Sequence, residues 1–165
     1  MANPSPYRSL SPEKRVQLVT HVIKASKEGR AIMVQRMMSR GGFRPVTLQS
    51  WPAEKLASEI VRMKAETGSD ELDLLHLLYV ELEPAIQTTF LDAAGVKHDG
   101  GKIPEELKSP YADEAGVKRG VAAVRTKHGE EGERYLKTLA RYAAEAWPGI
   151  DAATSFSRLP GGNAE

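Results

Sequence analysis

Two side chains that could bind a metal together lie three residues apart in the middle of the chain. Asp73 and His76 share one face if the segment is helical, because residues at i and i+3 are neighbours on a helix surface. Helical di-metal centres are built from such pairs, but they need a second pair on a facing helix. The sequence has no second pair of this kind. It therefore favours a polar core site at Asp73 and His76 over a metal centre.

A glycine-rich stretch near 96–103 has some resemblance in spacing to loops that bind calcium or phosphate. If Gly101 takes the place of the required glycine of a calcium loop, Val96 and Leu107 stand where the loop needs carboxylate ligands. In a phosphate-binding loop, Ile103 would replace the serine or threonine after the lysine. The stretch is predicted to be a tight turn between helices, with a small hairpin as the candidate structure.

Three arginines in the basic N-terminal half could bind a phosphate backbone. Arg36 and Arg40 share a helix face, and Arg44 follows a glycine pair. Residues 1–68 carry 12 lysines or arginines against 5 acidic residues, whereas residues 69–114 carry 3 against 11. The opposite charges can steer a charged partner or simply attract one another within the fold.

Four methionines occur at helical spacing, and the same spacing fits a hydrophobic core or an adaptable binding surface. The core is the favoured interpretation, and exposure of the first two would point to a groove for a partner helix. The four are Met33, Met37, Met38 and Met63.

A search for catalytic motifs finds none. There is no nucleophile elbow, no zinc-protease motif and no dinucleotide fingerprint, and the four histidines lie on different segments. The chain has no cysteine, which excludes disulfides and thiolate chemistry and fits a reducing cytoplasm. The first residues show no secretory signal, and no segment is long and apolar enough to anchor in a membrane. We expect no catalytic residue and no cofactor.

The elements that would position these residues are predicted to be helices around Leu72–Leu82. This segment has apolar side chains at nearly every helical angle, which is typical of a helix surrounded by other helices. The predicted fold is all-α, a single-domain bundle of six or seven helices over residues 11–150. Residues 1–10 are expected to be a flexible arm, and residues 151–165 a disordered tail.

Local signals place several helix boundaries. Ser11 and Pro12 are a typical helix start, and Gly41-Gly42 is a typical helix end. The link from Phe43 to Gln49 is expected to be extended. Gly129 is expected to divide two helices, and the pair Gly116 and Gly120 would let another helix approach closely.

These observations favour a cytoplasmic helical module without catalytic activity that binds a protein partner or a second copy of itself. The alternative is nucleic-acid binding through Arg36, Arg40 and Arg44. A membrane partner is not expected.

Overall fold

The computed structural model describes residues 5–66 and 71–156, and all structural statements concern these residues. They form eight α-helices and one π-helical segment and contain no β-strand, so the predicted all-α class is confirmed. The chain divides into two compact units, Met1–Leu74 and Leu75–Glu165. The structure thus does not confirm a single-domain bundle, and each unit is described by itself.

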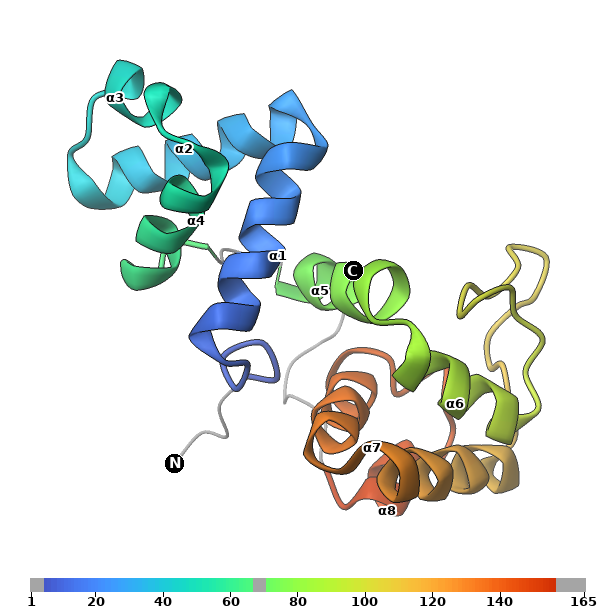
Figure 1. Cartoon of the computed structure of the whole chain (residues 1–165). Helices are drawn as coiled ribbons and strands as arrows, with labels where there is room; N and C mark the ends of the chain where they lie inside the picture. The colour runs from blue at the N-terminus through green and yellow to red at the C-terminus, as the bar shows by residue number, and fades with distance from the viewer. Residues whose placement is uncertain (1–4, 67–70, 157–165) are drawn as a thin grey trace. The chain divides into compact units, whose positions relative to one another are not determined.

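Unit 1 contains four helices: α1 (Pro12–Ala25), α2 (Lys27–Gly41), α3 (Pro45–Ser50) and α4 (Ala53–Arg62). Helix α1 packs against α2 and α4, and α2 also packs against α3 (Figure 1). Their apolar faces meet in one core, which consists of Val19, Ile23, Met33, Val34, Met37, Leu48, Leu56, Ala57, Ile60, Val61 and Ala65.

The predicted boundaries of α1 and α2 are confirmed where a cap specifies them. The Ser11 hydroxyl accepts a hydrogen bond from the Lys14 N–H at 3.2 Å, with Pro12 at the first helical position. Helix α2 ends at Gly41, and Gly42 adopts φ 66°, a left-handed conformation that favours glycine. The segment after Gly42 differs from the prediction, because residues of the expected extended link form α3.

Unit 2 contains the π-helix η1 (Leu77–Leu82), α6 (Ala85–Ala94), α7 (Glu114–Tyr142) and α8 (Ile150–Thr154). Helix α6 packs along α7 at the two predicted glycines. A Cβ on Gly120 would lie 2.7 Å from the Phe90 ring, and one on Gly116 would lie 2.8 Å from the Ala94 carbonyl oxygen. The predicted break at Gly129 is also confirmed, since α7 has a non-helical φ/ψ pair there.

The leucine-dense segment Leu72–Leu82 is not a continuous buried α-helix. Helix α5 (Glu71–His76) passes into η1, and the unit boundary follows Leu74. Leu72 and Leu82 are 44% and 38% exposed, so the segment is not apolar and buried on all sides. Its buried residues are Leu74, Leu75, Leu78, Tyr79 and Val80.

The described residues of the predicted arm and tail include a buried side chain and a short helix. Tyr7 is fully buried in the segment assigned to the arm, and α8 occupies the start of the segment assigned to the tail. Residues 1–4 and 157–165 of those two predictions lie outside the described residues. The predicted turn near 96–103 is present, closed by an isolated antiparallel bridge between Asp99 and Lys102.

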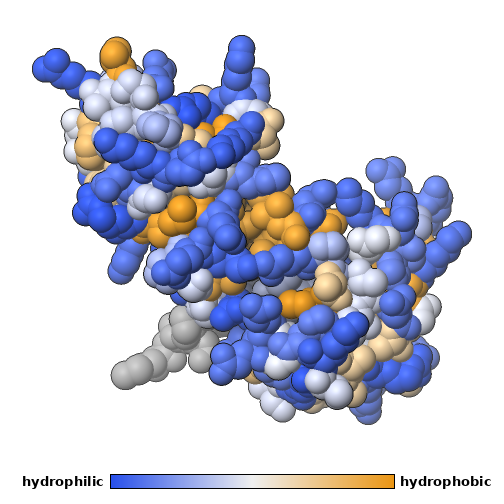
Figure 2. Space-filling model, in the orientation of Figure 1, coloured by the Kyte–Doolittle hydropathy of each residue, from blue (hydrophilic) through white to orange (hydrophobic). Residues whose placement is uncertain are grey.

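Charged and polar residues dominate the face of the molecule that Figure 2 shows. Within the described residues, no helix combines the length and the apolar character that crossing a membrane requires.

Candidate functional site

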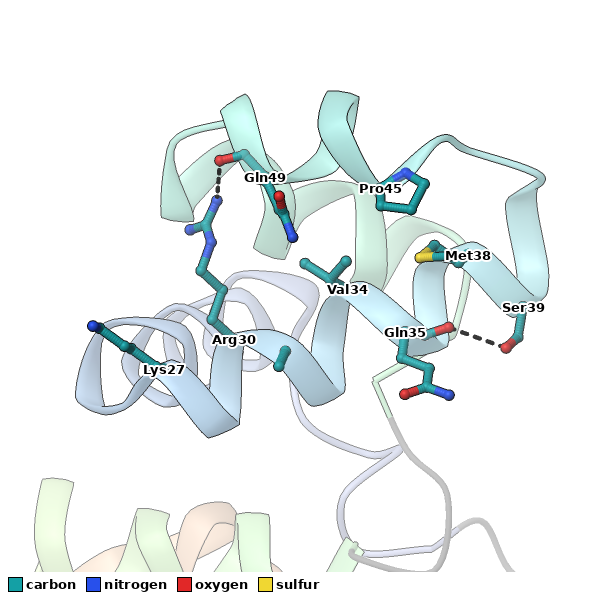
Figure 3. Close-up of a pocket in the computed structure, with 9 residues that line it drawn as sticks. Lys27, Arg30, Val34, Gln35, Met38, Ser39, Pro45 and Gln49 are labelled. Atoms are coloured by element: carbon teal, nitrogen blue, oxygen red, sulfur yellow. Dashed lines mark hydrogen bonds between the residues drawn. The ribbon is translucent and has the colours of Figure 1, made fainter.

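A groove of about 640 Å³ lies between α2 and α3 in unit 1. Most of its lining surface is apolar, and Figure 3 shows Val34 and Met38 on the side of α2 that faces Pro45 and Gln49. The lining residues are Lys27, Arg30, Ala31, Val34, Gln35, Met38, Ser39, Pro45 and Gln49.

The sequence builds this groove from one helix face and a tight reversal. Ala31, Val34 and Met38 recur at i, i+3 and i+7, so they share one face of α2. Gly42 then reverses the chain, and Pro45 begins α3 with the φ angle that a first helical residue needs. The short helix α3 therefore returns alongside this face of α2 and covers only part of it, which leaves the groove open.

Arg30 fixes the position of α3. Its Nη2 donates hydrogen bonds to the carbonyl oxygens of Gln49 at 3.1 Å and of Trp51 at 2.7 Å, and to that of Leu48 at 3.4 Å. These are carbonyls at the C-terminal end of α3, which a helix leaves without internal partners. Arg30 forms no ion pair within the described residues, so its charge is not neutralised by a neighbouring carboxylate.

The charged side chains that line the groove are all positive. Lys27 is exposed beside it, Arg30 supplies a second positive charge, and none of the nine lining residues is acidic. An apolar surface beside uncompensated cations favours a ligand with apolar groups and carboxylates.

The methionines divide between core and groove. Met33 and Met37 are 1% and 0% exposed, which confirms the core prediction for both, and Met63 packs against the same core. Met38 is half-buried and lines the groove, where a flexible thioether can adapt to a ligand.

The three arginines proposed for phosphate contact lie in different environments. The Nη1 of Arg36 donates to the Glu66 carbonyl oxygen at 2.6 Å, and Arg36 is half-buried. Arg40 is exposed near the end of α2, and Arg44 is exposed at the N-cap position of α3. Of the three arginines, Arg36 therefore makes a hydrogen bond within the fold, and none of the three lines the groove.

A buried ionic cluster lies in unit 1 around Glu66, whose side chain is 0% exposed. Its Oε1 accepts hydrogen bonds from Arg8 Nη1 at 3.1 Å and from Arg15 Nη1 at 2.9 Å. Burial, followed by the negative charge of Glu66, raises the pKa of Tyr7 far above its ordinary value. Sequence reasoning missed this cluster because partners 51 and 58 residues from Glu66 leave no local pattern.

The predicted polar core site at Asp73 and His76 is not formed, because both side chains are exposed. The buried positions of their segment are the leucines next to them, so the two polar residues point out of the core. No group of three or more metal-ligating side chains comes together within the described residues.

A second pocket of about 640 Å³ lies in unit 2 beside Thr89 and His128. Thr89 Oγ1 donates to the Ala85 carbonyl oxygen at 2.9 Å and lies 2.9 Å from His128 Nε2. Because its proton is directed to the carbonyl, the hydroxyl accepts from the imidazole and is not activated as a nucleophile. His98 is likewise structural, with Nδ1 accepting from the Gly101 N–H at 3.1 Å.

Comparisons of the chain with protein-family models, with curated proteins and with solved structures give no match. The function is therefore inferred from the geometry of the chain itself.

Proposed function

We propose that this protein is a non-catalytic helical module that binds a partner protein through the α2–α3 groove. The partner contributes a segment whose apolar side chains are flanked by carboxylates. The observation that carries the proposal is an open groove of about 640 Å³ with a mostly apolar lining, two cations and no acid. A cytoplasmic location stays a prediction.

The chemistry of the groove supports this class of ligand. Apolar side chains of the partner would displace water from Val34, Met38 and Pro45, which supplies the non-directional part of binding. Carboxylates would meet Lys27 and Arg30, which favours association and selects against basic segments.

Nucleic-acid binding through Arg36, Arg40 and Arg44 is the alternative. The structure gives it less support, because the Arg36 guanidinium is bound to the Glu66 carbonyl and is half-buried. A duplex of mixed sequence at low salt, where phosphate contacts are strongest, provides the test. Binding that Arg40→Gln weakens would replace the proposed function with this alternative.

The proposal is tested with two synthetic helical peptides that carry leucines at i and i+4. One has glutamates beside the leucines, and the other has lysines at the same positions. The protein is labelled at its methionine methyl groups and observed by NMR. We expect the acidic peptide to shift the Met38 signal and to leave buried Met33 and Met37 nearly unchanged, whereas the basic peptide causes no shift.

A pair of variants locates the binding site. Ala31→Arg places a long side chain in the groove, and Ile32→Arg adds the same charge at the adjacent position, which is 51% exposed and does not line it. Only Ala31→Arg should abolish peptide binding. Equal binding of both peptides, or equal loss in the two variants, would refute the groove as the site.

A further inference from the structure

We infer that the segment entering the α2–α3 groove belongs to a second copy of this chain, and that it is the exposed loop at Glu105-Glu106-Leu107. This inference rests on the proposed function and names the partner. It assigns the groove of one copy and the loop of another to a single interface.

Leu107 is unusual among the exposed large hydrophobic residues of the described chain. It is 37% exposed and lies in a loop, whereas the other members of the set lie on helices. The other exposed large hydrophobic residues are Ile32, Val46, Leu72 and Leu82.

Hydrogen bonds hold the backbone of the loop around Leu107. The bridge between Asp99 and Lys102 closes the preceding turn with two hydrogen bonds of 2.9 Å, and Pro104 is half-buried. The Leu107 N–H then donates to the Pro104 carbonyl oxygen at 3.1 Å. Residues 105–110 are all exposed. A segment that is already ordered loses less conformational entropy on binding than a flexible one.

The charges of the loop and the groove are complementary. Glu105 and Glu106 are exposed and form no ion pair within the described residues. The groove presents Lys27 and Arg30 without an acidic lining residue. Leu107 supplies the apolar group that Val34 and Met38 would contact. The two carboxylates directly precede it and the exposed Lys108 follows it, so the segment keeps a net negative charge.

The groove and the loop are different surfaces of one chain, so two arrangements of copies satisfy the inference. In a two-fold dimer, each copy inserts its loop into the groove of the other, and association stops at two copies. In a head-to-tail arrangement, the end copies keep one unused groove or loop, so assembly continues with concentration or closes into a ring.

Light scattering during size separation, from about 10 µM to 1 mM protein, tests the inference in the range of weak contacts. We expect the average mass of the full chain to rise with concentration. Leu107→Asp and Ala31→Arg should each weaken association at least about tenfold. The matched controls are Leu82→Asp, at a residue of equal exposure, and Ile32→Arg, and both should associate like the parent.

Mixing the two defective variants gives the decisive result. Ala31→Arg retains the loop, and Leu107→Asp retains the groove, so an equal mixture should form a 1:1 complex although neither variant associates alone. Monomers throughout the concentration range, no complex in the mixture, or an equal loss in Leu82→Asp would overturn the inference. The proposed function would survive a failure of the self-association inference if the acidic peptide still binds the parent protein and Ala31→Arg abolishes that binding.

Discussion

Replacing Glu66 by glutamine should destabilise unit 1 by about 3 kcal/mol. Removing one partner of a buried ion pair costs about 3–5 kcal/mol, because a charge is left in a medium that solvates it poorly. The lower end applies here, since the Arg8 side chain is 32% exposed and can turn toward water. Arg15 cannot do so as readily, because its side chain is 14% exposed and its buried Nε has no partner within the described residues.

The two tryptophans make the assay specific to one unit. Trp51 lies in unit 1 and Trp147 in unit 2, so a Trp147→Phe background leaves Trp51 as the fluorescent reporter of unit 1. Urea is the suitable denaturant because it adds no ions. Glu59→Gln is the matched control, since it removes a carboxylate that pairs with the largely exposed Arg62, and it should change the free energy of unfolding little.

The reasoning fails if Glu66→Gln lowers the free energy of unfolding no more than Glu59→Gln does. A second comparison separates charge burial from simple loss of a contact. In the double variant Glu66→Leu, Arg15→Leu, no charge of that pair stays buried, and apolar pairs of similar volume are often as stable as the ion pair they replace. We therefore expect the double variant to be more stable than the sum of its single changes predicts.

Three further predictions concern backbone conformation, close packing and buried phenols. Gly129→Ala should destabilise unit 2 by roughly 1–3 kcal/mol, since Gly129 has φ 53° and ψ −128° and open space around its Cβ position, so the cost is backbone strain alone. Gly120→Ala should cost about 1–3 kcal/mol for a different reason, because its Cβ would overlap the Phe90 ring and main chain. Trp147 fluorescence during urea unfolding, in a Trp51→Phe background, measures the stability of both variants. An unchanged unfolding midpoint in one of them would contradict the prediction for that variant. Burial raises the pKa of three tyrosines above the ordinary value of 10.0, so the unfolded chain loses these protons first and stability falls as pH rises above about 10. Tyrosinate absorbance from these three phenols should therefore appear only on unfolding, and its appearance in the folded protein near pH 10 would contradict the burial. The three are Tyr7, Tyr79 and Tyr135.

The parts of the fold that the sequence predicts are those that a few adjacent residues determine. The start of α1 depends on Ser11 and Pro12, and the end of α2 depends on a glycine that adopts positive φ. The sequence also predicts the close approach of another helix at Gly116 and Gly120, because the two glycines share a helix face, and the structure identifies that helix as α6 with Phe90. In each case the physical cause lies within one or two helical turns of the residues that show it.

The groove could not be predicted in the same way. Pro45 suggested an extended link from Phe43 to Gln49, whereas a six-residue helix forms there. Isolated helices of this length are marginal in water, so tertiary contacts must stabilise α3. Arg30 supplies them from 18 or more residues away, together with the fully buried Leu48. Without α3, the exposed part of α2 carries no sign that Val34 and Met38 line a groove.

The leucine-dense segment shows that composition alone does not determine architecture. Three of its six leucines are buried, together with Tyr79 and Val80, but the unit boundary follows Leu74 and the backbone changes to a π-helix at Leu77. A segment that is apolar at nearly every angle satisfies one large core or two smaller ones equally well, because the hydrophobic effect is non-directional. The pattern of contacts beyond the segment decides between them. For unit 1 those contacts include the ionic cluster at Glu66, whose partners lie 51 and 58 residues away in the sequence.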